Sequence, residues 1–228
     1  MVIIVRKVTS RMEQNKLKIN DLISQVIDSK KQDWDFGDVI TLHSYLNRNL
    51  CIDEISMELG QTVNNLIRFW NQQDDENEIP VEEREPINLY IDSPGGSLTA
   101  TLTIVDSIIM SKTPVRTINM GSAYSGGFLI FIVGHERITY PSASFMFHEG
   151  STSSMGDAHK FRNFSDFYDK QLERIKKITL EYTDMTEEYY EENKKDDVWL
   201  LAEEALQYGV CDKIADNMKN WQKIYFLI

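Results

Sequence analysis

Cysteines and long apolar runs are scarce in this sequence, and each shortage excludes a class of protein. The 228 residues include only two cysteines, Cys51 and Cys211, which are too few and too widely spaced for a disulfide framework or a zinc site. We therefore expect two packed thiols in a reducing, cytoplasmic compartment. The apolar residues 1–5 are followed at once by Arg6 and Lys7, so this run is too short for a signal-peptide core or a membrane span.

Positive charge is also in short supply. The chain has 24 lysines and arginines against 36 aspartates and glutamates, which gives a formal net charge of -12 and a pI of about 4.8. An acidic surface repels phosphate backbones and anionic lipids, so neither a nucleic acid nor a membrane is an expected partner. Hydrophobic residues make up 42% of the chain, which is enough for a sizeable core, and the length suits one α/β domain.

The first forty residues differ from the rest of the chain. They are mixed in charge and show no strong periodicity apart from a short helical stretch at 16–31, so we treat residues 1–40 as an N-terminal appendage and residues 41–228 as the main domain. The acidic run at residues 74–85 is predicted to be a solvated loop, with cation binding as the less favoured alternative. Before it, an amphipathic helix is predicted from four apolar residues at helical spacing, Val63, Leu66, Ile67 and Trp70.

The middle of the chain alternates between strand-like and helix-like segments. Short β-rich runs end in turns of glycine and serine, and these turns lead into apolar helices. Such alternation is typical of an α/β fold in which crossover helices join parallel strands. The predicted segments are strands at 87–91, 115–120, 137–140 and 144–148, and helices at 98–109 and 128–133.

Two further helices are predicted in the last third of the chain. The apolar residues of 157–182 are spaced more loosely than a core helix requires, so we expect this long polar helix to project and contact another subunit. A shorter helix at 202–207 ends before Gly209, a residue that suits the position just after a helix C-terminus.

Ser125 has the local surroundings of a nucleophile. It lies in a turn of small residues just before the apolar helix at 128–133, so free N–H groups at the helix start point at any charge that develops beside it. Acyl transfer requires this combination of a hydroxyl and backbone donors. The turn is not the G-x-S-x-G elbow of α/β-hydrolases, because residue 123 is alanine. A serine that merely caps the helix is the alternative.

His148 is the histidine best placed to act as a base for Ser125. It is the one histidine of four that ends an apolar strand, and the active-site groups of open α/β sheets gather at strand ends. A purely structural histidine is the alternative. The glycine turn at 93–96 has neither a dinucleotide-binding nor a Walker pattern, so phosphate binding is not expected there. Gly95 and Gly96 indicate either a tight turn or a place where the backbone of another chain approaches closely.

Four blocks of the sequence occur in the order seen in a known family. They resemble ClpP, the proteolytic subunit of the Clp protease, and the resemblance extends over roughly residues 60–215. It assigns the nucleophile to Ser125, the base to His148 and the triad acid to Asp197, with Asp196 as the rival acid in a one-residue shift of the alignment. The blocks are residues 87–97 (INLYIDSPGGS), 121–127 (GSAYSGG), 145–148 (FMFH) and 202–209 (AEEALQYG).

The resemblance also implies the rest of the site. The oxyanion-hole donors fall on the backbone of Gly96 and Gly126, and substrate contacts fall on Ser97, Leu98 and Glu149. It implies no metal and no cofactor.

The resemblance further implies an architecture and an assembly. The ClpP/crotonase-like fold is an α/β spiral of strand–strand–helix units, and the helix at 157–182 would be its protruding handle, which joins two rings back to back. Family members form heptameric rings that enclose the active sites, and an AAA+ unfoldase feeds them substrate. We therefore expect a homo-oligomer that cleaves unfolded polypeptides, with an AAA+ unfoldase as its partner.

This sequence departs from the family pattern at several positions. Gly150 stands where the family usually has proline, and Tyr124 is bulkier than the small residue usual before the nucleophile. Residues 1–40 do not resemble the family's axial loop. The apolar tail at 221–228 is expected either to contact another subunit or partner or to pack onto its own domain.

The predicted function is that of a serine endopeptidase inside an oligomeric chamber. The main alternative is a catalytically weak ClpP-like subunit with a structural role in the ring, which the presence of all three triad residues disfavours. A crotonase-type acyl-CoA enzyme is a further alternative. It would need two backbone N–H groups but no triad, so the presence of the triad residues disfavours it. A signal-peptide-peptidase relative would need a Ser–Lys dyad and a membrane anchor.

Overall fold

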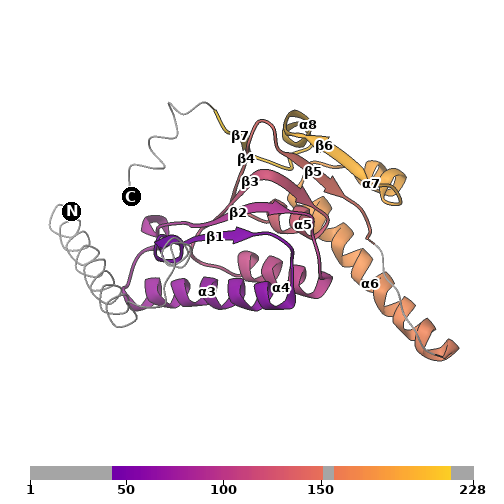
Figure 1. Cartoon of the computed structure of the whole chain (residues 1–228), viewed down its shortest axis with the longest axis horizontal. Coiled ribbons are helices and arrows are strands. Elements are labelled where there is room, and N and C mark those ends of the chain that lie inside the picture. The colour runs from indigo at the N-terminus through magenta and orange to yellow at the C-terminus, as the bar shows by residue number, and fades with distance from the viewer. Residues whose placement is uncertain (1–42, 151–156, 217–228) are drawn as a thin grey trace, which may run out of the picture. The chain divides into compact units, whose positions relative to one another are not determined.

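The computed structural model describes residues 43–150 and 157–216 (Figure 1). The chain divides into two units between Leu46 and Asn47, and the fold below is that of the second unit. The appendage at 1–40, with its helical stretch, and the apolar tail at 221–228 lie outside the described residues, so the predictions made for them remain predictions.

A mostly parallel sheet forms the centre of this unit. Its strands follow the order β1-β2-β3-β4-β7, while β5 pairs with both β3 and β6. Every pair is parallel except β5–β6, and the predicted α/β class with parallel strands is confirmed. The strands are β1 (Asn49–Ile52), β2 (Ile87–Ser93), β3 (Val115–Tyr124), β4 (Glu136–Thr139), β5 (Ser144–Phe147), β6 (Val198–Leu201) and β7 (Lys213–Ile214).

Helices connect the strands and cover the sheet. Figure 1 shows α3 and α4 side by side along one face of β1, β2 and β3. The apolar stripe predicted for the first helix faces the core, since Val63, Ile67 and Trp70 are buried. The helices are α3 (Met57–Glu76), α4 (Leu98–Ile109), α5 (Gly126–Ile132), α6 (Ala158–Tyr182), α7 (Glu187–Asn193) and α8 (Ala202–Gln207), with a 3-10 turn at Val81–Glu83.

Helix α6 is the predicted projecting helix. It has 25 residues, and only Ile175 and Thr179 are buried. Figure 1 shows its N-terminal half extending away from the sheet, where Phe161 and Phe167 are each more than half exposed. The projecting helix predicted from the loose apolar spacing is therefore present, and its role as a handle that joins two rings stays a prediction.

The acidic run at 74–85 was predicted to be a solvated loop, and this prediction is wrong for its first residues. Helix α3 continues to Glu76, and the Asp74 side chain is completely buried. The Arg48 guanidinium holds its carboxylate with two hydrogen bonds of 2.8 and 2.6 Å, and the Thr113 hydroxyl donates a third of 2.7 Å. Paired charges and satisfied lone pairs allow a carboxylate to be buried, which charge counting along the sequence cannot detect.

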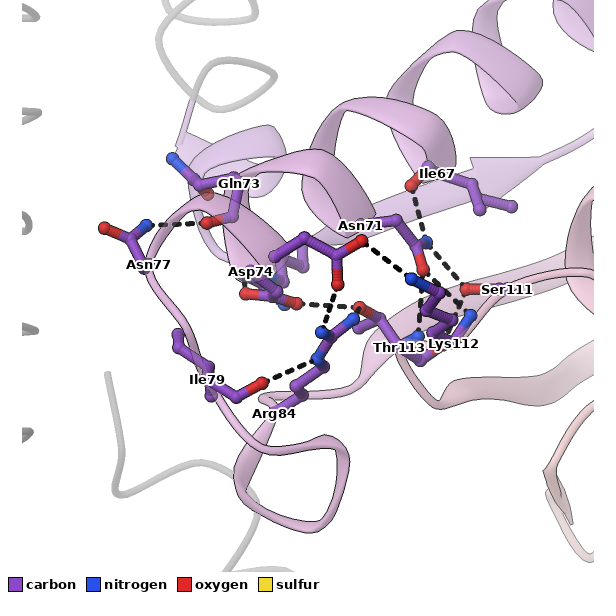
Figure 2. Close-up of polar contacts among 12 residues, drawn as sticks. Ile67, Asn71, Gln73, Asp74, Asn77, Ile79, Arg84, Ser111, Lys112 and Thr113 are labelled. Atoms are coloured by element: carbon purple, nitrogen blue, oxygen red, sulfur yellow. Dashed lines mark hydrogen bonds and ion pairs between the residues drawn. The ribbon is translucent and has the colours of Figure 1, made fainter.

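Asp75 is also engaged rather than freely solvated. Hydrogen bonds from Arg84 and Lys112 lower the pKa of its carboxyl group. Figure 2 shows Arg84, Lys112 and Thr113 converging on the C-terminal end of α3. This cluster ties the end of the helix to the segment that leads into β3.

The two cysteines differ in environment. Both thiols are free, but Cys211 is buried and Cys51 is exposed, so the expectation of two packed thiols is wrong for Cys51. Burial raises the pKa of Cys211 to about 11. Among the helices of the described ranges, none has the length and apolarity needed to span a membrane.

Candidate active site

Strand β3 pairs first with β4 and then, at its carboxyl end, with β5. The second pairing brings Ser125 next to β5. Residues 116–119 pair with β4, whereas residues 122–124 pair with β5. The N–H of Ser125 continues the second ladder by donating to the carbonyl oxygen of Met146 at 2.8 Å. Ser125 therefore sits at the carboxyl end of β3, directly against the last residues of β5.

The register between β5 and β6 brings His148 and Asp197 together. In this antiparallel pair Phe147 lies opposite Val198, so one further step along each strand places His148 opposite Asp197. The side chains meet, with His148 Nδ1 at 3.0 Å from Asp197 Oδ1 and His148 Nε2 at 2.8 Å from Ser125 Oγ. A chain of two hydrogen bonds thus joins the three residues.

The rival acid, Asp196, is not part of this chain. It is exposed, and its backbone N–H donates to the carbonyl oxygen of Asn193. The residue opposite His148 and bonded to its ring is Asp197, and the assignment of Asp197 rather than Asp196 as the triad acid stays a prediction.

Ser125 has an unusual backbone conformation, with φ 52° and ψ -114°. Few residues other than glycine adopt positive φ, and such strain persists where the surrounding structure imposes it. The side chain makes no capping hydrogen bond to α5, so the alternative of a mere helix cap does not describe this serine. Its hydroxyl points instead to His148.

The backbone N–H groups of Gly96 and Gly126 flank Ser125. Gly96 forms a parallel bridge with Ile55. The two hydrogen bonds of this bridge are made by the neighbours of Gly96: the Gly95 carbonyl oxygen accepts from the Ile55 N–H, and the Ser97 N–H donates to the Ile55 carbonyl oxygen. The N–H of Gly96 therefore points to the opposite side of the strand, the side of β3. A Cβ atom at Gly95 would lie only 2.8 Å from that of Ser125, which shows how closely the two turns approach.

Within residues 43–150 and 157–216, no hydrogen bond is donated by Gly96 or Gly126. Two free donors beside a serine hydroxyl can stabilise a negative charge on an attacked carbonyl oxygen. No cluster of three or more histidine, cysteine or acidic side chains in the described segments could hold a metal ion.

Comparison with known proteins connects this arrangement to a family. The family model described as Clp protease matches residues 54–218, which is more than half of the chain. The chain belongs to the Clp protease family. This confirms the resemblance predicted from the four sequence blocks, and it indicates a peptidase of the ClpP type.

Curated relatives of this Clp protease family member carry the same family name. It is 28% identical over 204 residues to ATP-dependent Clp protease proteolytic subunit 2 of Treponema denticola, a match that covers 88% of this chain and 98% of the relative. It is 33% identical over 139 residues to proteolytic subunit 1 of Streptomyces avermitilis, which covers 60% of this chain and 64% of the relative. The proteolytic subunit of Streptococcus suis is 34% identical over 137 residues, with 58% of this chain and 70% of the relative covered.

The residues predicted to contact substrate in this Clp protease family member follow Gly96 and His148 in the chain. Ser97 caps α4, since its Oγ accepts a hydrogen bond from the N–H of Ala100 at 3.4 Å. Leu98 opens the same helix and is partly exposed. Both follow directly after Gly96, and their contact with substrate stays a prediction.

Glu149 belongs to a charged network that reaches α6. Its carboxylate lies 3.6 Å from Lys194 Nζ, and its carbonyl oxygen accepts a hydrogen bond from the Tyr168 hydroxyl of α6. Lys194 also pairs with Glu191 at 2.8 Å, and Glu191 pairs with Lys176 of α6 at 2.6 Å. The residue after His148 is thereby linked to the base of the handle helix.

Lowering the pH is expected to weaken this network. Hydrogen bonds from Lys176 and Lys194 hold the pKa of Glu191 at about 2, against an ordinary 4.5. Because the folded pKa is the lower one, the carboxylate contributes its full stabilisation above pH 4.5 and loses it as the pH falls toward 2. In urea titrations, the difference in unfolding midpoint between wild type and Glu191→Gln should be largest at neutral pH and shrink on acidification.

Glu192→Gln provides the matched control for this prediction. It removes the same charge from the next residue, which forms no ion pair with any residue that the structure describes. Its midpoint should differ little from that of wild type at every pH. Equal pH profiles for the two variants would contradict a specific role for the Glu191 pairs.

The two departures from the family pattern next to the triad have structural explanations. Gly150 has φ 79°, which the proline ring cannot adopt because it holds φ near -65°. Tyr124 is accommodated because its ring packs edge-on against Trp199, with ring centroids 5.0 Å apart. Sequence reasoning noticed Tyr124 but not Trp199, and the alternation of residues 197, 199 and 201 on one face of a strand could have indicated it.

Proposed function

We propose that this chain is a serine endopeptidase that cleaves unfolded polypeptides. The single observation that supports the proposal best is the continuous hydrogen-bond chain from Ser125 through His148 to Asp197, with distances of 2.8 and 3.0 Å. Free backbone donors beside the serine and membership of the Clp protease family support the same function.

The proposed mechanism follows from the atoms in contact. His148 Nε2 takes the proton of the Ser125 hydroxyl as Oγ attacks a peptide carbonyl carbon. The carboxylate of Asp197 accepts a hydrogen bond from the Nδ1–H of the ring, which keeps Nε2 available as the base and stabilises the imidazolium that forms. The imidazolium then gives its proton to the leaving amine, and water repeats the sequence to release the acyl group from Ser125.

The oxyanion of the tetrahedral intermediate is proposed to bind the N–H groups of Gly96 and Gly126. Gly96 is exposed, and Gly126 is the first residue of α5, where the helix dipole also favours negative charge. We propose that Ser97, Leu98 and Glu149 contact the bound polypeptide.

An oligomeric chamber is part of the proposal. The protruding helix α6 exposes aromatic side chains that a partner subunit would cover, which supports a homo-oligomer built as a heptameric ring or double ring. The relatives are named ATP-dependent Clp protease proteolytic subunits, and we propose that an AAA+ unfoldase likewise delivers substrate to this chain. Native mass spectrometry tests the assembly, and a monomer under assay conditions would contradict it.

Covalent labelling of Ser125 tests the proposed chemistry. A fluorophosphonate should add one adduct to the assembled wild-type protein and none to Ser125→Ala, measured by intact mass. Ser122→Ala is the matched control, because it removes a hydroxyl from the same strand that bonds to Asp92 rather than to the triad, and it should label like wild type.

Each other outcome of the labelling has a definite meaning. An adduct on Ser125→Ala would show that another serine is the nucleophile. An unlabelled wild-type protein that still assembles would support the alternative of a catalytically weak structural subunit and refute the proposed peptidase activity.

A further inference from the structure

The base and the acid that follow Ser125 in the hydrogen-bond chain both lie just beyond their strands. The ladder between β5 and β6 ends at the pair Phe147–Val198, one residue short of His148 and of Asp197. Their side chains nevertheless meet at 3.0 Å, although Asp197 is exposed. Catalytic side chains keep such a geometry only when neighbouring contacts hold them. Restraint on this pair must therefore come from residues outside the ladder.

Lys194 joins the segment that follows β5 to the segment that precedes β6. Its carbonyl oxygen accepts a hydrogen bond of 3.3 Å from the N–H of Glu149, the residue directly after His148. Lys194 also precedes Asp197 by only three residues. Together with the hydrogen bond between His148 and Asp197, this contact closes a ring of chain, so a shift at Lys194 would reach both catalytic side chains.

The ammonium group of Lys194 reinforces the backbone contact. It lies 3.6 Å from the carboxylate of Glu149 and 2.8 Å from that of Glu191. The side chains of Lys194 and Glu149 are only 24% and 25% exposed, so water screens this pair less than it would at an open surface. The hydrogen bond with Glu191 and the charge of Glu149 raise the pKa of Lys194, which keeps the ammonium group charged well above neutral pH.

Helix α7 fixes the position of Lys194. The N–H of Lys194 donates to the carbonyl oxygen of Tyr190 at 2.8 Å, and Lys194 is the C-terminal cap of the helix. Tyr190 is only 2% exposed, and its ring stacks on that of Phe147 with centroids 6.0 Å apart. Because Phe147 directly precedes His148, the end of α7 contacts the residues on both sides of the histidine.

We propose that Lys194 is a positioning residue for the His148–Asp197 pair. The inference rests on the proposed peptidase function and adds to it a residue that acts through Glu149. The ammonium group holds Glu149 against the turn that leads to Asp197, and this keeps Nδ1 of His148 within hydrogen-bond distance of the carboxylate.

Lys194→Met tests the inference, because it removes the ammonium group and keeps a side chain of similar length. In the assembled protein, kcat for a fluorogenic peptide should fall about tenfold while KM stays within about twofold, and Lys194→Arg should recover most of the loss. The rate of fluorophosphonate labelling should fall by about the same factor, since it depends on activation of Ser125 by His148. The loss should be partial, because the Tyr168 hydroxyl still holds the carbonyl oxygen of Glu149.

Two control variants separate positioning from stability. Lys195→Met removes the same charge from the next residue, which is exposed and forms no ion pair with residues 43–150 and 157–216, and it should keep the wild-type kcat and labelling rate. Glu191→Gln breaks the pairs of Glu191 with Lys176 and Lys194 but leaves the contact between Lys194 and Glu149. It should therefore lower the urea unfolding midpoint and keep kcat within about twofold of wild type.

A double-mutant cycle tests whether Lys194 acts through Glu149. Glu149→Gln removes the carboxylate but keeps the shape and the backbone N–H of that residue. Labelling with a small fluorophosphonate, which carries no polypeptide, measures this variant without the proposed substrate contact of Glu149. The labelling rate should fall, and the double variant Lys194→Met with Glu149→Gln should be no slower than the slower single variant. Effects that multiply would mean that Lys194 acts by another route and would overturn the inference.

The other outcomes separate the inference from the function on which it rests. Unchanged kcat and labelling in Lys194→Met would overturn the positioning role and leave the peptidase intact, and an equal loss in Lys195→Met would overturn it by assigning the effect to net charge. If Lys194→Met does not assemble, Glu149→Gln decides: slower labelling supports the role and normal labelling overturns it. A wild-type protein that neither labels nor cleaves would overturn the proposed function and the positioning role together.

Discussion

Asp197→Asn is expected to lower kcat for peptide hydrolysis about 10⁴-fold. The carboxylate of Asp197 lies 3.0 Å from Nδ1 of His148, where it accepts a hydrogen bond from the ring N–H. An asparagine would either present its amide donor to that nitrogen or fail to stabilise the imidazolium, and Nε2 would no longer be available as a base for Ser125. Steady-state kinetics on a fluorogenic peptide would measure the loss, with KM expected to change far less than kcat.

Asp196→Asn is the matched control for this prediction. The substitution is chemically identical and lies one residue away, at an exposed position that does not contact His148. We expect kcat within about twofold of wild type, since surface substitutions away from a site have small effects. The opposite result, with Asp196 essential and Asp197 dispensable, would mean that the β5–β6 register is different in the active protein.

Asp74→Ala is expected to destabilise the fold by about 3–5 kcal/mol, the range for breaking a buried ion pair. The carboxylate is fully buried, and Arg48 opposite it has only 11% of its side chain exposed. Among residues 43–150 and 157–216, removing the acid would leave the guanidinium with one acceptor, the carbonyl oxygen of Glu85. It would also leave the buried Thr113 hydroxyl without the carboxylate that accepts its hydrogen bond. Urea unfolding followed by tryptophan fluorescence would measure the change in free energy of unfolding.

Two further variants make the Asp74 prediction specific. Asp106→Ala removes a carboxylate from an exposed position on α4 and should change the free energy of unfolding by less than about 0.5 kcal/mol. A double variant, Arg48→Met with Asp74→Leu, replaces both charges by apolar groups and should recover much of the lost stability. A loss below about 1 kcal/mol in Asp74→Ala would show that the pair is not needed to hold the end of α3.

Much of the α/β pattern could be predicted from the sequence. Strands β2 to β5 and helices α3, α4, α5, α6 and α8 all lie where periodicity and turn residues predicted them. Strands β1, β6 and β7 and helix α7 were not predicted, because such short segments carry too little periodicity to stand out. The acidic run was misjudged because the sequence shows the charge of Asp74 but not the Arg48 that neutralises it, 26 residues earlier.

The three proposed catalytic residues differed in how far the sequence alone could identify them. Ser125 could be found from its own surroundings, because a small-residue turn before an apolar helix is a local feature. His148 could be nominated from its position at the end of a strand. Asp197 could not be chosen without the family resemblance, since nothing around it distinguishes it from Asp196.

The sequence by itself determined most of the strands and helices of the α/β core, the small-residue turn that carries Ser125 and the family to which the chain belongs. Only the tertiary structure decided that β3 passes from β4 to β5 and that His148 stands opposite Asp197 rather than Asp196. It alone also placed Tyr124 against Trp199. The physical reason is that turns and periodicity are properties of neighbouring residues, whereas strand register is set by burying whole faces of strands that are distant in the chain.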